Sequence, residues 1–421
     1  MTIAVRLGLL LATLAPALAP PAARAADPAD LPRARPEEVG VSPERLKRID
    51  DVVKRYIDEN RVAGAVTLVA RRGQVVHFEA QGVMDTESKA PMRTDSIFQM
   101  ASCTKPVTGV AVLMMIEEGK VALTDPVSKY VPEFKGAKVA IEENGETRLV
   151  AADREVTIRD LMTHTSGLMS GGVGQRKGPP ELGRPGGAGA TLAEGVGRFA
   201  AVPLDFQPGT RWRYSGLGGI DTLARVVEVA SGKAFDEFLR ERIFTPLGMR
   251  DTFFVLPSDR DDRLASIHQR AEKALKKVPS SIRFPETYPS GAGGLYSTAA
   301  DYFRFGQMLA NGGELDDKRL LSPRGVELMG SNHVGHQFEG QAGRPGGMGF
   351  GLTVEVVVDP VRAGTYRSKG SFGWDGAFGT HFWVDPQENL VAVLLIQTGG
   401  RDFHRDFETA VMQSIVIPAP R

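Results

Sequence analysis

The stretch KPVTGVAVLMMIEEG, residues 105–119, is apolar on nearly every side of a helix between Val107 and Ile116. A helix that is apolar all round leaves no face for water, so other elements must enclose it on every side. The fold must therefore carry this helix through the middle of a large core. Ser102 and Lys105, at the start of the helix, are then placed beside that core.

Strand patterns gather at the two ends of the chain. Near the N-terminus, the runs 65–71 and 75–82 flank a Gly-containing turn, which predicts a hairpin. Near the C-terminus, four runs predict strands at 351–358, 364–369, 376–384 and 389–397. Because the middle is mostly helical in pattern, we expect an α+β fold: an antiparallel sheet built from both chain ends and flanked by helices, with a mostly helical part beside it.

Turn and cap residues predict further elements. Ser42 and Pro43 suit the N-cap and first position of a helix, and Asn144-Gly145 suits the turn of a hairpin over 139–151. Helices are also expected at 157–167, 218–231, 234–243, 298–311 and 404–415. The Gly- and Pro-rich stretch 167–192 is the longest without periodicity, so we expect a functional or disordered loop there.

The first 25 residues are predicted to be a signal peptide. Arg6 supplies a positive charge, Leu7 to Leu18 form an apolar core too short to span a bilayer, and Ala23-Arg24-Ala25 is a cleavage signal. An uncleaved anchor is the alternative. We expect a periplasmic or secreted protein, without stable membrane insertion, whose mature chain starts near Ala25/Ala26.

The mature chain is expected to form one catalytic unit. An extended leader at 26–41 precedes that unit, which is predicted to span 42–416. Within it, the α/β part is expected at about 42–100 and 290–416, and the helical part at about 101–289. With 51 basic and 51 acidic side chains, the neutral chain gives no reason to expect nucleic acid as a partner. We expect a monomer that acts on a small molecule.

Ser102 and Lys105 form a Ser-x-x-Lys motif at the start of the buried helix. Residues three apart share a helix face, so the amine can reach the hydroxyl. A serine is a weak nucleophile until a base removes its proton, and a buried lysine can be that base. Tyr214, which precedes a Gly-rich turn, is a candidate to shuttle the proton. The motif alone is weak evidence, since N-cap serines and core tyrosines are common.

Six ordered motifs give the chain a more specific likeness. They are MASCTK (100–105), LMTHTSGL (161–168), FQPGTRWRYS (206–215), FTPLGMRDTFF (244–254), PSGAGGLYSTAADYFRF (289–305) and GWDGAFGTHFWVDP (373–386). In these stretches the chain resembles the serine β-lactamase and penicillin-binding-protein superfamily, specifically its class C-like branch and the family VIII carboxylesterases. The resemblance covers roughly residues 36–416 and implies a β-lactamase/transpeptidase-like fold.

The resemblance also implies roles for individual residues. Ser102 would be the acylated nucleophile, with Lys105 and Tyr214 as the proton-relay pair. The family's third motif, usually K-T-G or H-x-G, falls on Trp374-Asp375-Gly376. The oxyanion hole would use the backbone N–H groups of Ser102 and Ala377, and close backbone approach there calls for Gly376. No cofactor and no metal are implied.

Two departures from the family pattern bear on the substrate. Trp374 brings no cation to hold a substrate carboxylate, and Asp375 would repel one unless it is neutral or paired. Gly216 replaces the asparagine of the Y-x-N motif, which binds the acyl-amide of β-lactams. We therefore expect carboxylic ester hydrolysis with weak or no β-lactamase activity. The alternatives are a β-lactamase or D-Ala-D-Ala carboxypeptidase/D-amino peptidase acting on an amide, an acyltransferase, and a non-catalytic ligand-sensing relative.

Other kinds of site have less support. An α/β-hydrolase needs a G-x-S-x-G elbow, which the sequence lacks, and a zinc site needs a third ligand near His333 and His336. Cys103, the sole cysteine, has no histidine partner to form a thiolate and is predicted to be a small buried residue. His164 and His381 are predicted to be structural, with His381 as an alternative pocket-lining residue.

Overall fold

The computed structural model describes residues 31–184, 187, 189–272 and 274–418. The predicted signal peptide and its cleavage site lie outside the described residues. The core of the fold is a seven-stranded antiparallel sheet with the strand order β11-β12-β13-β14-β15-β1-β2. Its strands are β1 (Gly64–Arg71), β2 (Gln74–Gly82), β11 (Met348–Phe350), β12 (Glu355–Val357), β13 (Phe372–Asp375), β14 (His381–Asp385) and β15 (Leu390–Leu395).

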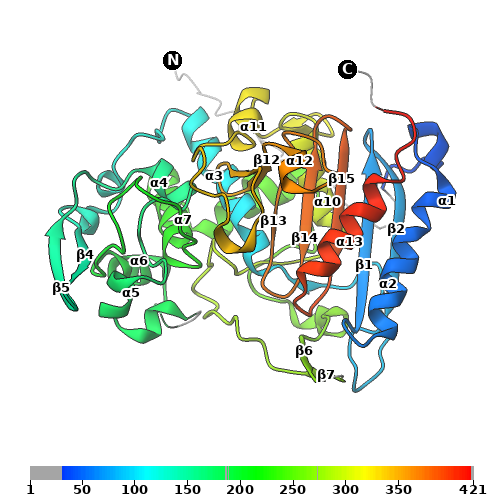
Figure 1. Cartoon of the computed structure of the whole chain (residues 1–421), viewed down its shortest axis with the longest axis horizontal. Coiled ribbons are helices and arrows are strands. Elements are labelled where there is room, and N and C mark those ends of the chain that lie inside the picture. Colours follow the sequence, from blue (N-terminus) through cyan, green and yellow to red (C-terminus); the bar gives the residue numbers. More distant parts are fainter. Residues whose placement is uncertain (1–30, 185–186, 188, 273, 419–421) are drawn as a thin grey trace, which may run out of the picture.

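Both chain ends build this sheet, as predicted. β1 pairs with β15 along its length, from Val66 opposite Leu395 to Arg71 opposite Leu390. Figure 1 shows the N-terminal strands and the C-terminal strands side by side. The α+β class, with a mostly helical part beside the sheet, is therefore confirmed.

Three of the four predicted C-terminal strands differ from the structure. Of the run 351–358, only Glu355–Val357 forms a strand, β12. Residues 364–369 form no strand, because Arg367 turns inward to pair with Glu355 (3.0 Å from Nη2 to Oε1) and Gly370 (φ +84°) turns the chain. The Arg367–Glu355 ion pair thus outweighs the β-propensity of residues 364–369. The next strand, β13, starts at Phe372. The run 376–384 becomes a strand only at His381, since its first residues form a turn.

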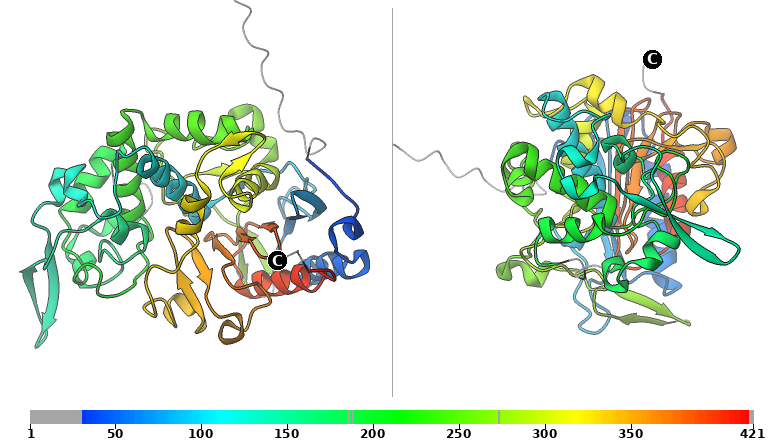
Figure 2. Two further views of the ribbon diagram at one scale, coloured as in Figure 1. Left: turned by 90° about the horizontal axis from the view of Figure 1, so that it is seen from above. Right: turned by 90° about the vertical axis from the view of Figure 1, so that its left-hand side faces the viewer.

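Helices cover both faces of the sheet (Figures 1 and 2). On one face lie α1 (Pro43–Leu46), α2 (Arg48–Asp58) and α13 (Arg401–Met412); Ser42 caps α1 as predicted, accepting a hydrogen bond from the Arg45 N–H. On the other face, α10 (Ala299–Ala310) packs against β1, β14 and β15. The C-terminal helix begins and ends three residues earlier than the predicted 404–415.

The apolar helix predicted from the sequence is α3 (Thr104–Glu117), and every residue from Thr104 to Met115 is buried. It packs against α7 (Gly218–Ser231), whose bounds match the prediction, and it links the sheet to the helical part. That part also contains α4 (Ile158–Met162), α5 (Val173–Lys177), α6 (Leu192–Ala200) and the predicted hairpin of β4 (Lys138–Glu143) and β5 (Glu146–Ala151).

Several connecting segments differ from prediction. The stretch 167–192 holds α5 and a 3₁₀ turn at Pro180–Gly183, rather than being aperiodic throughout. The helix expected at 234–243 is α8 (Phe235–Leu239), a π turn (Arg240–Phe244) and α9 (Thr245–Leu247). Further short elements are β3 (Phe98–Gln99), β6 (His268–Ala271), β7 (Ala274–Lys277), β8 (Tyr296–Ser297), β9 (Glu314–Leu315), β10 (Lys318–Arg319), α11 (Pro323–Met329) and α12 (Pro360–Ala363).

Within the described part of the chain, no helix combines the length and apolar character needed to cross a membrane.

Candidate active site

Ser102 lies in a 3₁₀ turn (Ala101–Cys103) between β3 and α3, so the turn rather than α3 itself carries the serine. Ala101 adopts φ +45°, a left-handed conformation that a residue with a Cβ rarely adopts. Its neighbours fix this geometry: the Met100 N–H donates to the Leu295 carbonyl (2.9 Å), and the Cys103 N–H donates to the Met100 carbonyl (3.1 Å). The turn keeps Ser102 and Lys105 on one side, as the three-residue spacing predicts.

Lys105 is completely buried beneath Ser102. Its Nζ lies 3.2 Å from Ser102 Oγ, 2.9 Å from the Gly216 carbonyl oxygen and 2.7 Å from the Ala292 carbonyl oxygen. The two carbonyls only accept hydrogen bonds, so they take two N–H groups of the amine. The third direction of the nitrogen is aimed at the serine hydroxyl.

Tyr214 approaches Ser102 from the helical part, and its Oη lies 2.8 Å from Ser102 Oγ. The tyrosine ring packs between the rings of His164 (4.8 Å between centroids) and Trp374 (5.7 Å). His164 is buried and accepts a hydrogen bond at Nδ1 from the Ser215 N–H (3.3 Å). Burial and the nearby charge of Lys105 hold the pKa of His164 well below its usual value. His164 is therefore neutral and fixes the chain beside Tyr214.

Asp221 positions Lys105 indirectly, through the backbone of Ala292, and no sequence motif indicated this role. It is fully buried on α7 and accepts hydrogen bonds from Tyr288 Oη (2.9 Å), Ser290 Oγ (2.8 Å) and the Ala292 N–H (3.0 Å). Burial raises the pKa of Asp221 to about 6, although these donors oppose the shift. Asp221 thus holds the backbone of Ala292, the residue whose carbonyl binds Lys105.

The end of β13 reaches the turn that carries Ser102. A Cβ built on Gly376 would lie 2.5 Å from the Met100 carbonyl oxygen, so only glycine allows this approach. Thr380 Oγ1 donates to the same carbonyl (2.9 Å) from the far side of the 376–380 turn. Ser102 and Ala377, the two predicted oxyanion donors, line one cavity of about 300 Å³. Trp374, Asp375, Gly376 and Tyr214 line the same cavity.

Asp375 belongs to a buried ion network, which accounts for an aspartate next to the active site. Arg344 Nη2 lies 2.5 Å from Asp375 Oδ2, and His381 Nδ1 lies 2.6 Å from Asp375 Oδ1. The network continues through Glu355, Arg367 and Glu408, with three carboxylates facing Arg344, Arg367 and His381. Burial opposes ionisation of Asp375, but Arg344 and the two neighbouring histidines hold its pKa well below the usual value.

The two histidines of this network differ in charge. Burial disfavours charge on His381, but Asp375 and Glu408 outweigh burial and raise its pKa to about 9. Burial lowers the pKa of His404 to about 4. Among the described residues, Asp375, His381 and His404 form the group whose ligand atoms are close enough to hold a metal ion, all within 4.8 Å. Because Asp375 is already paired with Arg344 and with protonated His381, the group fits an internal ion pair better than a cation site.

Trp374 is more enclosed than a flat substrate platform would be, with 6% of its surface exposed. Its ring contacts Phe350 edge-on, and the Arg344 guanidinium lies over it at 5.8 Å from the centroid. Cys103 is fully buried, its Sγ lies 3.5 Å from the Trp374 carbonyl oxygen, and burial raises the pKa of the thiol. The cysteine is thus held as a neutral thiol.

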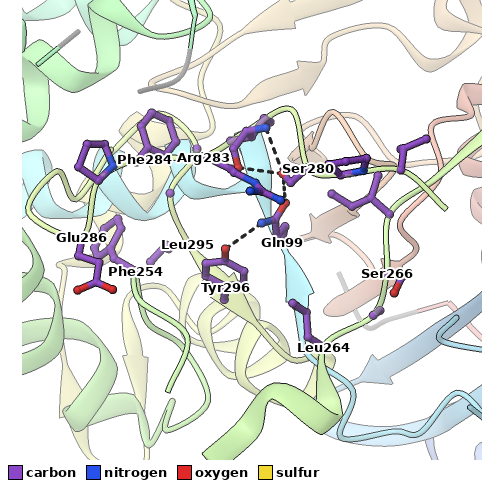
Figure 3. A pocket seen from close by; sticks show the side chains of 18 of the residues that line it. Gln99, Phe254, Leu264, Ser266, Ser280, Arg283, Phe284, Glu286, Leu295 and Tyr296 are labelled. Atoms are coloured by element: carbon purple, nitrogen blue, oxygen red, sulfur yellow. Dashed lines mark hydrogen bonds between the residues drawn. The ribbon is translucent and has the colours of Figure 1, made fainter. Parts of the chain in front are cut away.

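A second cavity opens on the other side of Ser102. It measures about 350 Å³ and is lined by Ser102, Tyr214, Gly216 and residues of the 169–183 and 282–293 segments. A Cβ on Gly216 would meet only Tyr214 Cε1, at 3.9 Å, so this position leaves open space. Beyond the 282–284 segment lies a third and larger cavity of about 450 Å³ (Figure 3). Ser102 therefore stands between two cavities, one of which adjoins a third.

Comparison with known proteins places this geometry in a family. Residues 49–416 match the model of the Beta-lactamase family. Protein Rv1367c of Mycobacterium tuberculosis is 34% identical over 82% of this chain and 88% of its own length. Esterase EstB of Burkholderia gladioli is 33% identical over 83% of this chain and 90% of its own. The structure is also similar to that of EstCE1, a hydrolase with promiscuous acyltransferase activity, with TM-score 0.75, 28% identity, and coverage of 88% of this chain and 99% of that one.

Proposed function

The chain belongs to the Beta-lactamase family of serine hydrolases, and we propose that it cleaves carboxylic esters through an acyl-enzyme on Ser102. The observation that carries the proposal is the convergence of Lys105 Nζ and Tyr214 Oη on Ser102 Oγ, at 3.2 Å and 2.8 Å. A serine hydroxyl needs such partners to lose its proton as it attacks a carbonyl carbon. The likeness to Esterase EstB supports an ester as the substrate.

The proton moves along this short path. Lys105, with two N–H groups held by the Gly216 and Ala292 carbonyls, accepts the Ser102 proton as Oγ attacks the ester carbon. Tyr214 passes a proton to the leaving alkoxide, which departs as an alcohol and leaves an ester on Ser102 Oγ. Water then attacks the acyl-enzyme by the reverse route, and the carboxylic acid leaves. The N–H groups of Ser102 and Ala377 stabilise the oxyanion, each contributing about 3 kcal/mol in the transition state.

We assign the acyl group and the alcohol group of the substrate to the two cavities that contain Ser102. Gly216, which occupies the position that binds the acyl-amide in the family, lines the 350 Å³ cavity, so we assign the acyl group to it. Trp374 and Asp375 line the 300 Å³ cavity, which takes the alcohol. Because Arg344 is paired with Glu355 and Asp375 there, its charge is already balanced. This supports a neutral leaving group and weak or no β-lactamase activity.

One observation favours an alternative. Arg401, at the start of α13, also lines the cavity assigned to the alcohol, and a guanidinium there suits an anionic leaving group such as that of a β-lactam or a D-Ala-D-Ala peptide. An acyltransferase is a second alternative, because an alcohol or amine can replace water at the acyl-enzyme, and the similar protein EstCE1 is a hydrolase with that promiscuous activity. The retained Ser102 environment favours an enzyme over a sensor.

We further propose the remaining features expected from the sequence. The signal peptide at 1–25 would export the protein to the periplasm or the medium, and 42–416 would act as one catalytic unit and as a monomer on a small molecule. Size-exclusion chromatography with light scattering measures the oligomeric state. N-terminal sequencing of the exported protein locates the cleavage site.

The main experiment treats the protein with a fluorophosphonate probe and maps the adduct by mass spectrometry. We expect the adduct on Ser102, loss of p-nitrophenyl butyrate hydrolysis in Ser102→Ala, and retained hydrolysis in the adjacent control Cys103→Ala. A substrate panel with nitrocefin and a D-Ala-D-Ala peptide separates the alternatives. If nitrocefin were hydrolysed far faster than the butyrate ester, the esterase assignment would be wrong.

A further inference from the structure

The third cavity measures about 450 Å³, more than either cavity that contains Ser102, and its role is not part of the mechanism above. Its wall is mostly apolar, formed by Phe254, Leu264, Ile267, Ile282, Phe284 and Leu295. Part of the polar wall is internally paired: Gln99 donates to Tyr296 Oη (2.8 Å) and accepts from Ser280 Oγ (2.6 Å), as Figure 3 shows. Lys277 pairs with Asp85 (2.6 Å), whereas Arg283 and Glu286 make no hydrogen bond or ion pair within the described residues. Because apolar side chains form the larger part of the wall, the cavity suits an apolar ligand.

This cavity adjoins the acyl cavity that contains Ser102. Ile282, Phe284 and Gly293 line both of them. A Cβ on Gly293 would lie 3.7 Å from the Ala101 carbonyl carbon, so Gly293 runs directly past the residue before the nucleophile. Ile282 also packs on a small apolar cluster of Ala101, Ile267 and Phe378, in which Phe378 follows the oxyanion donor Ala377. An apolar path therefore leads from Ser102 past Gly293 and Ile282.

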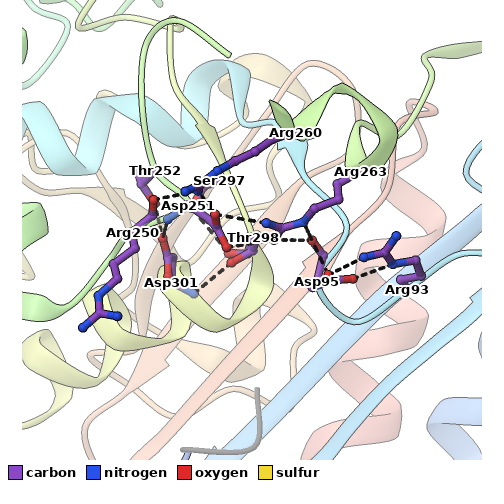
Figure 4. Close-up of polar contacts among 10 residues, drawn as sticks. All are labelled: Arg93, Asp95, Arg250, Asp251, Thr252, Arg260, Arg263, Ser297, Thr298 and Asp301. Carbon is purple, nitrogen blue, oxygen red and sulfur yellow. Dashed lines mark hydrogen bonds and ion pairs between the residues drawn. The ribbon is translucent and has the colours of Figure 1, made fainter. Parts of the chain in front are cut away.

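The far wall of the cavity is rigid. The Ala265 N–H donates to the Ile97 carbonyl (2.9 Å), and the Ile97 N–H donates to the Arg263 carbonyl (2.7 Å). Arg263 pairs with Asp251 (2.8 Å) and bonds the Asp95 carbonyl, within the polar network drawn in Figure 4. This network fixes residues 263–267 at the edge of β3.

The near wall is a strap, residues 278–288, without regular secondary structure. Its ends are tied, by the Val278 N–H to the Ile267 carbonyl (2.9 Å) and by Tyr288 Oη to Asp221 (2.9 Å). Between them Ser280 bonds Gln99, whereas Arg283 and Phe284 make no hydrogen bond within the described residues. Ile282 is bonded to Ser280 through its N–H (3.1 Å) and its carbonyl (2.9 Å), whereas Phe284 is held by packing against Tyr288 (5.7 Å between ring centroids). Between the two cavities, the strap is therefore held least firmly at residues 283–284, where a chain can pass beneath it.

We propose that the third cavity is the distal half of the acyl site and binds the end of a linear apolar acyl chain, of octanoyl length or longer. The inference rests on the proposed function, because the carbonyl end of that chain is the one attacked by Ser102. The proximal atoms occupy the acyl cavity, the chain passes Gly293 beneath Ile282 and Phe284, and its end lies against Leu264 and Ile267. The substrate class is then medium-chain esters rather than acetates.

The test measures kcat/KM for p-nitrophenyl butyrate and octanoate below their aggregation limits. Each methylene that enters the cavity favours the longer ester by up to about fourfold, so we expect the wild-type ratio of octanoate to butyrate to exceed about 10. Leu264→Trp fills the far end of the cavity and should lower this ratio at least fivefold. Ile282→Ala widens the passage and should raise it. Leu149→Trp, the same exchange on the exposed surface of β5, is the matched control and should leave the ratio unchanged.

A second series varies the alcohol and measures kcat/KM for ethyl butyrate and octyl butyrate. The ratio of these two values should be the same in wild type and Leu264→Trp. If neither variant changes the octanoate-to-butyrate ratio of kcat/KM while p-nitrophenyl butyrate is still hydrolysed, the distal site is refuted and the esterase assignment stands. A change confined to the alcohol series also refutes it. If the wild type hydrolyses no ester, the proposed function itself fails. Should thermal melting show that Leu264→Trp does not fold, Ile282→Ala decides the question alone.

Discussion

Tyr214 combines two tasks that a single substitution can separate. Its ring packs against His164 and Trp374, whereas its hydroxyl group contacts Ser102 Oγ. Tyr214→Phe keeps the packing and removes the hydroxyl group that we propose to transfer the proton. Because a positioned general acid or base contributes about 10²- to 10⁴-fold, we expect kcat for p-nitrophenyl butyrate to fall at least about 100-fold.

The melting temperature of Tyr214→Phe should stay within about 2 °C of wild type, because one partly exposed hydrogen bond is worth about 1 kcal/mol. The control is Tyr130→Phe, which removes a hydroxyl bonded to Asp125 far from Ser102 and should leave kcat unchanged. Full activity in Tyr214→Phe would exclude Tyr214 from the proton relay.

Asp221 shows which residues sequence reasoning misses. Ser102, Lys105 and Tyr214 stand in motifs whose spacing and resemblance identify them. Asp221 stands in an ordinary amphipathic helix pattern, and only the fold brings Tyr288, Ser290 and Ala292 to its carboxylate. The sequence shows only an acid next to apolar residues in a helix pattern. The feature that marks Asp221 is its complete burial, which cannot be read from a sequence before the packing is known.

Asp221→Asn tests this positioning role. An amide has one acceptor oxygen where the carboxylate has two, so it must release either the Tyr288 hydroxyl or the Ser290–Ala292 pair. We expect kcat to fall about tenfold while KM changes little, because Ala292 then holds Lys105 less firmly. Asp205→Asn is the comparison variant, because the Asp205 carboxylate bonds Ser170 near the acyl cavity. In this variant we expect KM to change rather than kcat. An unchanged kcat in Asp221→Asn would contradict the role.

At the scale of elements, the N-terminal hairpin was predictable from two strand-like runs that flank a turn, and the buried helix from a long run that is apolar on every side. The short strand β13 was not, since Phe372–Asp375 carries both an apolar face and a network aspartate. Residues 364–369 instead had strand-like composition, but Arg367 of that run is drawn into the same network through Glu355. Buried ion pairs between distant segments leave no periodic trace in the sequence.

The network at the end of β13 leads to a prediction about pH. The folded-state pKa of His381 is about 9, above its ordinary value of 6.5, because Asp375 and Glu408 outweigh burial. A raised histidine pKa contributes stability that is complete below pH 6.5 and is lost as the pH rises through 9. We therefore expect the melting temperature to fall between pH 7 and pH 10, and to fall less steeply in His381→Gln, measured by circular dichroism at fixed ionic strength.

Asp375→Asn is the companion variant for this element. It leaves Arg344 and His381 buried with fewer counter-charges, and breaking a buried ion pair costs about 3–5 kcal/mol. The pKa of His381 should fall as well, so the loss of stability would begin at lower pH than in wild type. Equal melting curves for Asp375→Asn and wild type at pH 7 and pH 9 would show that Asp375 does not bind the histidine.

On the scale of the whole molecule, the two chain ends meet at Arg71. This arginine ends β1 and is fully buried. Its Nη1 donates to the carbonyl oxygens of Val39 (2.8 Å), Gly40 (3.1 Å) and Ile417 (2.7 Å), and its Nη2 lies 2.5 Å from Glu388 Oε2. One guanidinium thus joins the segment before α1, the segment after α13 and the β14–β15 turn. The candidate active site lies elsewhere, at the junction of β13 and α3.

Arg71→Leu should therefore reduce stability without reducing activity. It removes the donor to the Val39 and Ile417 carbonyls and the buried ion pair with Glu388, so we expect the free energy of unfolding to fall by about 3–5 kcal/mol, measured by urea titration. Per folded molecule, kcat for p-nitrophenyl butyrate at 20 °C should stay within twofold of wild type. The control is Arg55→Leu, whose half-exposed pair with Asp406 should contribute less than about 1 kcal/mol. If Arg71→Leu were as stable as Arg55→Leu, the sheet and its helices alone would hold the two chain ends. If folded Arg71→Leu lost activity, the chain ends would be coupled to the candidate active site through β1.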